Sequence, residues 1–346
     1  MKKPIFKKKD FILCDVPAPI GYPQSQTRCG LAIYNGRILL SSSPYPEEAD
    51  IRKRAIKKVL RILTKGRLGN LINGEYFENP CLYEGIKNEE DIPIKFVPLA
   101  DNPLMPTPPK YKGIPSFCSD PQVFVDNDKV CVFNRIIRRE PIQSNGTVKY
   151  HYLTDIYKID GELNKGSFII TDINIFRQFS TPCISPTIIR FREWYYFMYV
   201  DSNSYNDGET FGSFYFIKSK TLEGLKTEKV VHRIQFEQDS LLPWHFSLFE
   251  YKDKLYAIVA CVERGIKKRC IQMLGVISDD IENLRLYEHP LTTMNSYRSA
   301  AMVLDDGRFV LYNATVNEFY NNDKSVDGRN IVMANMLFDE MLNSVE

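Results

Sequence analysis

Long apolar runs are absent from the sequence. No stretch approaches the roughly 18 consecutive apolar residues that a membrane-spanning helix needs. The N-terminal segment MKKPIFKKKD also lacks the apolar core of a signal peptide. We therefore expect no transmembrane segment, no signal peptide and no membrane partner, with synthesis in the cytoplasm.

A large excess of either charge is missing as well. The 346 residues carry a formal net charge of +2, so the field of the whole molecule predicts no nucleic-acid partner. One local basic run covers 51–67. Apolar residues from Ile51 to Leu63 fall on one face of this run and Gly66 ends it, which predicts a short helix over about 47–67. We interpret its basic face as a solvated surface.

The cysteines lack the spacings of metal sites. There are eight of them, with no CxxC pair and no cysteine–histidine cluster of zinc spacing, so no metal site is predicted. Cys131 and Cys261 lie inside apolar, strand-like runs. Burial as free thiols is therefore expected in preference to disulfide bonding.

What the sequence does contain is a repeated hairpin. An apolar segment, a tight turn and a second segment rich in β-branched and aromatic residues recur along the chain. Two of the turns, Asn35-Gly36 and Asp306-Gly307, are among the strongest short hairpin signals. The hairpins occupy 27–43, 118–135, 183–201, 243–261 and 297–315.

Five such hairpins predict an all-β fold, a single five-bladed β-propeller over 1–346 with the helix as an insertion in the first blade region. A four-stranded blade takes about 40–50 residues before loops are added, so five blades account for the chain. The segments 331–337 and 11–16 are expected to close the ring, which removes an exposed sheet edge. A β-sandwich of unrelated hairpins is the disfavoured alternative, because the hairpins begin alike.

The second hairpin begins with Ser119-Asp120-Pro121 and turns at Asn127-Asp128. This pattern resembles the second-blade motif of the five-bladed glycoside hydrolases, above all family 43, the arabinanases and β-xylosidases. The resemblance covers the blade rhythm of nearly the whole chain and is specific as sequence near Asp120. It implies a central funnel, and it implies that Asp120 is the aspartate that sets the pKa of the catalytic acid.

The same resemblance implies two further carboxylates that this chain lacks. In the family, the base is an aspartate at the start of blade one, where 24–28 here reads QSQTR. The acid is a glutamate at the start of blade three, where Ile184 stands. Because general acid help alone contributes about 10²–10⁴-fold, we expect no ordinary glycosidase activity on arabinan or xylan.

Positions relative to the turns predict which residues meet in the funnel. Arg28, Asp120, Ser185 and His245 stand at the same distance before their turns, and Arg298 is one residue off. Arg28 and Arg298 are expected to pair with Asp120 or to bind an anionic sugar. Ser185 is a further candidate ligand contact. The aromatic residues expected to stack on a sugar ring are Trp244, Tyr297 and Tyr22.

Two functions remain open at this point. The favoured one is a glycan-recognising propeller, a binding or structural protein that has kept the funnel and lost the chemistry. The alternative is an active, divergent glycoside hydrolase or lyase with relocated acid and base groups. Its candidate catalytic residues are Asp120, His245 and Glu209, because some propeller hydrolases that resemble the family use a histidine as the acid.

A carbohydrate is the expected partner under both readings. No cofactor is predicted, and a calcium or sodium ion in the funnel is left open. Without a signal peptide, three routes to a glycan remain: carriage on a bacteriophage particle with other virion proteins as partners, release by lysis, or another form of export.

Overall fold

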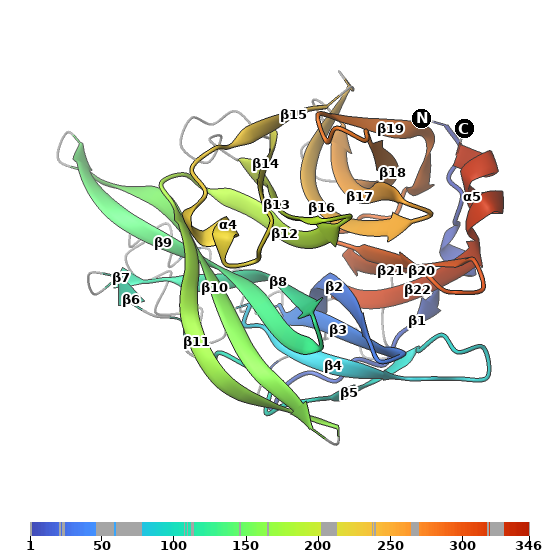
Figure 1. Cartoon of the computed structure of the whole chain (residues 1–346), viewed down its shortest axis with the longest axis horizontal. Coiled ribbons are helices and arrows are strands. Elements are labelled where there is room, and N and C mark those ends of the chain that lie inside the picture. The colour runs from blue at the N-terminus through green and yellow to red at the C-terminus, as the bar shows by residue number, and fades with distance from the viewer. Residues whose placement is uncertain are drawn as a thin grey trace.

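The computed structural model describes residues 2–20, 22, 25–45, 59, 78–106, 108, 110–111, 114–144, 147–164, 166–201, 213–236, 238, 240–263, 270–316, 318 and 329–345. Strands dominate these residues, which confirms the predicted all-β class (Figure 1). Apart from Val59, the predicted helix over 47–67 lies outside the described residues.

Strands that follow one another in sequence pair antiparallel to form the sheets. The first sheet has the order β2 (Gln26–Tyr34), β3 (Arg37–Pro44), β4 (Cys81–Ile86) and β5 (Lys95–Pro98). The second has the order β8 (Phe117–Asp126), β9 (Lys129–Ser144), β10 (Thr147–Asn164) and β11 (Ser167–Phe179).

An eight-stranded sheet consists of two antiparallel groups of four. The first group is β12 (Cys183–Phe191), β13 (Trp194–Asp201), β14 (Phe214–Ser219) and β15 (His232–Phe236). The second is β16 (Leu241–Tyr251), β17 (Lys254–Glu263), β18 (Cys270–Ile277) and β19 (Asn283–Thr292). The groups join at their outer edges, where β15 and β19 pair in parallel.

The last sheet unites the two ends of the chain. It contains β20 (Ala300–Val303), β21 (Arg308–Val316), β22 (Arg329–Leu337) and β1 (Ile12–Leu13). Ile12 lies opposite Met333 on β22, so the early segment pairs with the late one as predicted. The short elements are η1 (Lys8–Asp10), the pair β6 (Lys110–Tyr111) and β7 (Ile114–Pro115), α4 (Gly224–Thr227) and α5 (Phe338–Val345).

The predicted hairpins are the first two strands of each group of four. The turns Asn35-Gly36, Asn127-Asp128 and Lys252-Asp253 have positive φ at both central residues. That backbone matches the twist of the flanking strands, and Asn, Asp and Gly adopt it at low cost. Turn geometry of this kind therefore supports these three hairpins at their predicted positions.

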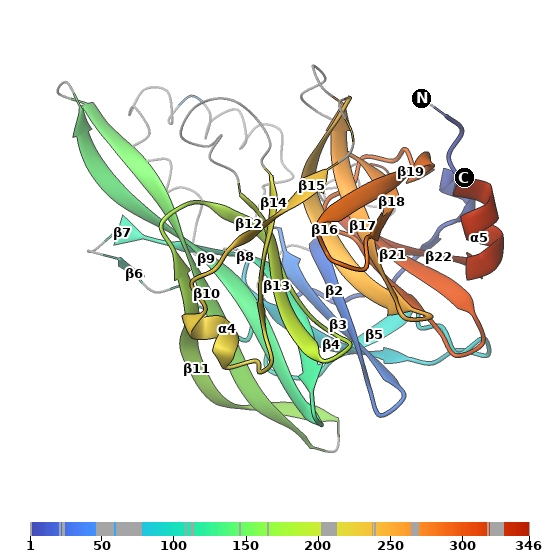
Figure 2. The ribbon, with the colours of Figure 1, turned by 45° about the horizontal axis from the view of Figure 1, so that its top comes forward.

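The first strands of the groups form a closed ring of neighbours. β2 contacts β8, β8 contacts β12, β12 contacts β16, β16 contacts β20, and β20 contacts β2. Figure 2 shows β2, β8, β12 and β16 in the middle of the molecule and β11 and β19 farther out. Apolar cores fill the space between adjacent groups, for example around Leu39 and Val123 between the first two sheets. The core around Leu40 and Tyr312 joins the first sheet to the last.

The second sheet is larger than the sequence indicated. The predicted hairpin ends at Arg135, but its second strand, β9, has 16 residues and runs on to Ser144, and its partner β10 has 18 residues. The hairpin of these two strands extends well beyond the neighbouring sheets (Figure 1). Among the described strands of the other groups, none is as long as β9 or β10.

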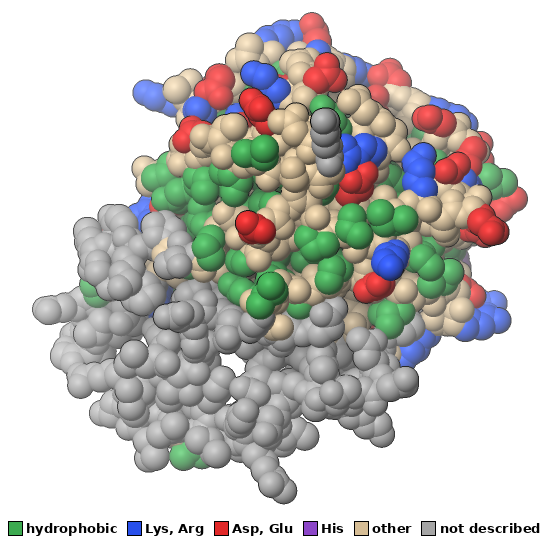
Figure 3. All heavy atoms as spheres, turned by 90° about the horizontal axis from the view of Figure 1, so that it is seen from below, with side chains coloured by type: hydrophobic (Ala, Val, Ile, Leu, Met, Phe, Trp, Pro, Cys, Tyr) green, Lys and Arg blue, Asp and Glu red, His purple; other side chains and the backbone are tan. Residues whose placement is uncertain are grey.

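The burial of the cysteines and the distribution of charge on the surface agree with what the composition predicts. All eight cysteines are free and buried, which confirms the predicted thiols. No helix within the described residues is long and apolar enough to cross a membrane. On the described part of the face in Figure 3, acidic, basic and apolar side chains are interspersed, in line with the balanced charge.

Candidate functional site

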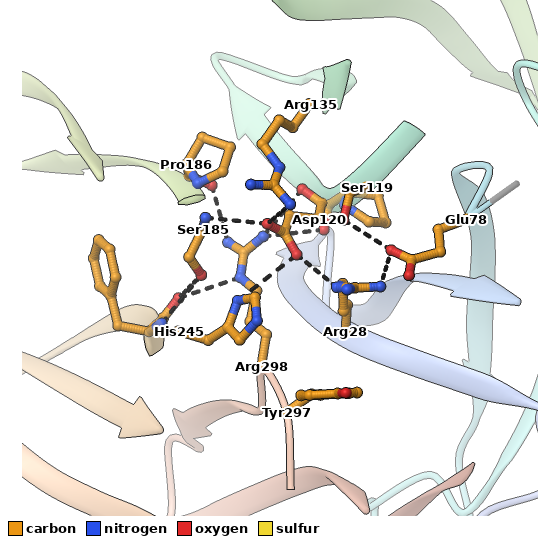
Figure 4. A network of polar contacts seen from close by, with 12 residues as sticks. Arg28, Glu78, Ser119, Asp120, Arg135, Ser185, Pro186, His245, Tyr297 and Arg298 are labelled. Atoms are coloured by element: carbon orange, nitrogen blue, oxygen red, sulfur yellow. Dashed lines mark hydrogen bonds and ion pairs between the residues drawn. The ribbon is translucent and has the colours of Figure 1, made fainter. Parts of the chain in front are cut away.

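The site is built from backbone irregularities at the starts of the inner strands. A register shift occurs in each of the strands β2, β8, β12 and β16. Each shift lies at or next to the residue that was predicted to enter the funnel. Arg28, Asp120 and Ser185 have left-handed backbone there, with φ of 61°, 50° and 53°. A β-bulge re-aims its side chain, and here the side chains converge (Figure 4). A bulge also tolerates a residue without an N–H group, which explains Pro121 and Pro186 inside inner strands.

Asp120 is the centre of this cluster. Its side chain is completely buried (0% exposed). Oδ1 lies 2.8 Å from Nε of Arg28 and 3.7 Å from Nδ1 of His245. Oδ2 lies 3.1 Å from Nη2 of Arg135 and accepts a 3.1 Å hydrogen bond from the backbone N–H of Ser185. Groups of the protein itself therefore occupy both carboxylate oxygens.

Arg298 crosses the same centre and is also fully buried. Its guanidinium donates hydrogen bonds to β8, β12 and β16. The acceptors are the carbonyl oxygens of Asp120 (3.2 Å), Pro121 (3.4 Å), Pro186 (3.1 Å) and Phe246 (3.2 Å), and Oγ1 of Thr187 (2.9 Å). Arg298 thus ties three inner strands to the start of β20.

Ser185 links β12 to β16 a second time. Its hydroxyl donates to the carbonyl of Phe246 at 2.9 Å and accepts from the N–H of the same residue at 3.1 Å. The structure therefore brings Arg28, Asp120, Ser185 and His245 together as their shared positions predicted, and Arg298 joins them.

Charges around Asp120 set its ionisation. Burial alone would raise the pKa of the Asp120 carboxyl, but the neighbouring guanidinium groups, that of Arg135 first, hold the pKa below its ordinary value. Burial, reinforced by the nearby arginines, lowers the pKa of His245 from 6.5 to about 3, against the opposing effect of Asp120. At neutral pH the cluster therefore holds an ionised aspartate and an uncharged histidine.

The neutral state of His245 predicts a pH dependence of stability. Between pH 6.5 and about 3 the unfolded chain protonates this imidazole and the folded chain does not. The unfolded state binds more protons there, so the free energy of unfolding should fall on acidification, by up to about 1.4 kcal/mol per pH unit. Urea unfolding at pH 6.5 to 4.5 measures the slope, and His245→Gln should flatten it. At pH 7.5 to 8.5, where the imidazole is neutral in both states, neither protein should show this slope. A slope between pH 6.5 and 4.5 that is the same in wild type and His245→Gln would contradict the assignment of the pH dependence to His245.

Aromatic side chains lie beside the cluster. The ring of Trp244 stacks on that of His245, with centroids 5.7 Å apart, and meets the Tyr297 ring edge-on at 6.0 Å. Trp244 and Tyr297 are both partly exposed. The hydroxyl of Tyr22 accepts a 2.9 Å hydrogen bond from Nδ2 of Asn79.

Two members of the cluster were not predicted from the sequence. Arg135 lies on β9 directly opposite Ser119, so the hairpin register held a usable signal. Glu78 forms an ion pair with Arg28 and accepts a 2.8 Å hydrogen bond from Oγ of Ser119. It comes from the long connection between β3 and β4, where no periodic pattern points to it. Glu209, a predicted catalytic candidate, lies outside the described residues.

The cluster has the chemistry of a guanidinium–carboxylate network. Among the residues that the structure describes, no group of three or more histidine, cysteine or acidic side chains is arranged to hold a metal ion. The oxygens of Asp120 face arginines, and a cation placed there would meet like charge.

Comparisons with known proteins establish the fold class. No protein-family model matches the chain, and no curated protein does. Solved structures of carbohydrate-active enzymes with a propeller fold match over nearly the whole chain. The predicted resemblance to the arabinanases and β-xylosidases is thus confirmed at the level of fold.

Three of these structures illustrate the sequence identity, TM-score and coverage of the matches. An N-acetylgalactosamine deacetylase from F. plautii in complex with blood group B trisaccharide is 14% identical, with a TM-score of 0.61 and 96% of each chain covered. A GH43_1 enzyme from Xanthomonas citri complexed with xylose is 9% identical, with a TM-score of 0.57 over 94% of this chain and 90% of that one. A Penicillium chrysogenum α-L-arabinanase complexed with arabinobiose is 12% identical, with a TM-score of 0.51 over 94% and 80%.

Proposed function

We propose that this protein is a glycan-recognising propeller whose funnel has kept its architecture and lost hydrolytic chemistry. The observation that carries the proposal is the state of Asp120. This carboxylate is buried, ionised, and held by Arg28, Arg135 and the backbone of Ser185. A carboxylate that acts on a sugar must reach the sugar or its acid partner, and this one has no exposed surface.

The proposal includes the five-bladed architecture and the single domain over 1–346. It is supported by the ring of contacts among β2, β8, β12, β16 and β20 and by the cores between adjacent groups of strands. On this assignment β15 and β19 are the outer strands of two neighbouring blades, which explains their parallel pairing.

A carbohydrate ligand is supported in two ways. The solved structures of similar fold include complexes with a blood group trisaccharide, with xylose and with arabinobiose. In this chain the partly exposed rings of Trp244 and Tyr297 adjoin the cluster, and such rings bind the apolar faces of sugars. The proposal needs no cofactor. Carriage on a phage particle rests only on the predicted absence of a signal peptide and forms no part of it.

One observation favours the alternative, an active hydrolase or lyase. Glu78 joins the cluster through Arg28 and Ser119, and its side chain is 16% exposed. It is an acidic group of the cluster with access to solvent, so relocated chemistry would use Glu78 as a base. Asp120 and His245 would then position it or the substrate.

Paired assays separate the two functions. Wild-type protein should be retained on an immobilised glycan panel and should release no reducing ends from arabinan or xylan. Trp244→Ala should weaken retention about tenfold, since stacking on an aromatic ring contributes on the order of 1 kcal/mol or more. The matched control is Trp194→Ala on β13, away from the cluster. Brisk hydrolysis that Glu78→Gln abolishes in a folded protein would establish the alternative instead.

A further inference from the structure

The outer strand of the second sheet differs from the outer strands of the other groups. β11 has 13 residues and forms the outer margin of its sheet, and no described strand pairs with its other side (Figure 1). The outer strands β5 and β1 have only four and two residues, and β15 and β19 pair with each other. Natural proteins protect the edges of sheets with short or covered outer strands, and β11 is neither among the described residues.

Four isoleucines of β11 are exposed to solvent. Ile169 is 54% exposed, Ile170 36%, Ile173 40% and Ile175 44%. A single exposed isoleucine is ordinary on a protein surface. Four of them on one outer strand form a patch of the kind that marks an interaction site.

The strand register separates these side chains into two faces. The residues of β10 opposite Ile170, Ile173 and Ile175 are alternate ones, so these three isoleucines share one face of the sheet and form a row. Ile169 lies opposite Glu162 and therefore belongs to the other face. The partners of the isoleucine row are Gly161, Ile159 and Tyr157.

Charge is confined to the face away from the isoleucine row. From Phe168 to Ile175 on β11 and from Tyr157 to Leu163 on β10, the face with the row carries no charged side chain. The other face of the same segments carries Asp172, Glu162, Asp160 and Lys158. Removal of the uncharged face from water is therefore favourable.

The first sheet covers only the inner part of the uncharged face. Val132 of β9 and Ile159 of β10 pack there in one core with Leu39 and Leu82. β5, the outer strand of the first sheet, ends after four residues at Pro98. Farther out, the isoleucine row remains open to solvent.

We propose that the isoleucine row is the contact of a homodimer, in which two copies pack this face of β10 and β11 against each other around a two-fold axis. Such a contact places the same patch of both copies together, so an apolar row meets an apolar row. The face offers no charge that would attract a charged partner, and a net charge of +2 gives two copies little mutual repulsion.

The edge of β11 is less suitable for the contact than its face. Oδ1 of Asp172 accepts a 2.8 Å hydrogen bond from the N–H of Ile173, so an added strand cannot take that donor freely. An acidic residue on an outer strand is one of the ways in which proteins prevent edge-to-edge pairing. The dimer is therefore expected to form face to face.

The available area predicts a weak dimer. A strand of 13 residues is about 40 Å long and a pair of strands is about 10 Å wide, so each copy would bury about 400 Å². The total of about 800 Å² lies below the roughly 1,200 Å² at which stable interfaces begin, in the range of transient contacts. We therefore expect a dissociation constant above about 1 µM.

Sedimentation velocity of the full chain, from about 1 µM to about 1 mM, tests this proposal. The mean mass should rise with concentration toward that of a dimer. Ile173→Lys should weaken association at least about tenfold, because a two-fold contact buries the introduced charge twice. Ile169→Lys, on the other face of the same strand, is the matched control and should associate like wild type. Ile175→Lys repeats the test should Ile173→Lys fail to fold.

Each other outcome would contradict part of the proposal. A wild type that stays monomeric at every concentration would overturn the homodimer and leave the row to a different partner. A dimer that Ile173→Lys and Ile175→Lys leave unchanged would overturn its assignment to the row. Equal loss of association in Ile169→Lys would exclude the face-to-face arrangement. Growth beyond a dimer would contradict a closed two-fold contact.

Discussion

Asp120→Asn is expected to lower the free energy of unfolding by about 3–5 kcal/mol, the usual cost of removing one partner from a buried ion pair. The amide has the shape of the carboxylate, so the loss is electrostatic. Arg135 would lose the carboxylate that it pairs with, Arg28 would keep only Glu78, and Ser185 would lose an ionised acceptor for its N–H. Urea unfolding at pH 7, followed by Trp fluorescence, measures the change.

Asp253→Asn is the matched control. Asp253 pairs with Arg192 at 3.2 Å, but both side chains are well exposed, so solvent screens the pair and the substitution should change stability little. Equal stability of Asp120→Asn and wild type would show that the central arginines are neutralised in another way. It would also remove the main support for a structural, non-hydrolytic Asp120.

The sequence predicts the positions of the site better than its chemistry. Turn residues such as Asn35-Gly36 mark the hairpin ends, and strand geometry makes positions at equal distance from the turns equivalent. This reasoning brings Arg28, Asp120, Ser185 and His245 to one place, where their contacts in the structure are found. Counting residues back from the turn works because the antiparallel pairing is continuous from each turn to the register shift.

The prediction of the site is incomplete for residues that do not lie at a fixed distance before a hairpin turn. Glu78 lies between the predicted helix over 47–67 and β4, where no periodic pattern marks it, and its place beside Arg28 depends on tertiary structure alone. Arg298 precedes β20 and is one position off, yet its long side chain reaches the shared centre. The extension of β9 and β10 has no marker in the sequence, because alternating polar and apolar residues do not limit the length of a strand.

The site also shows why an aspartate and a proline begin the second hairpin. The left-handed backbone at Asp120 is a conformation that aspartate tolerates better than most residues, and the bulge removes the need for an N–H group at Pro121. This pair of residues serves the local backbone whether or not the carboxylate acts on a substrate.

Arg298→Lys is expected to destabilise the protein by several kcal/mol, although the positive charge is conserved. Arg298 donates to four backbone carbonyls and one hydroxyl on β8, β12 and β16. An ammonium group has three donors on a flexible stem and cannot reproduce a planar fork that reaches three strands. Each buried carbonyl left without a partner costs about 1–3 kcal/mol, so two such losses exceed the cost of most single substitutions.

Arg298→Met separates the hydrogen bonds from the charge. Methionine fills similar space without donors, so every acceptor would lose the hydrogen bond that Arg298 donates, and the carbonyls of Phe246 and Pro121 would keep a donor, from Ser185 and Ser41. One buried positive charge near Asp120 would be removed at the same time. If the hydrogen bonds of Arg298 dominate, Arg298→Met should be less stable than Arg298→Lys in urea unfolding. If the cost of burying a positive charge dominates, the order of the two variants should reverse. Arg192→Lys, on an exposed turn, is the matched control and should leave stability unchanged. If both Arg298 variants are as stable as wild type, the inner strands hold together without this residue. The hydrogen bonds of Arg298 would then be a consequence of the ring of strands and would not stabilise it.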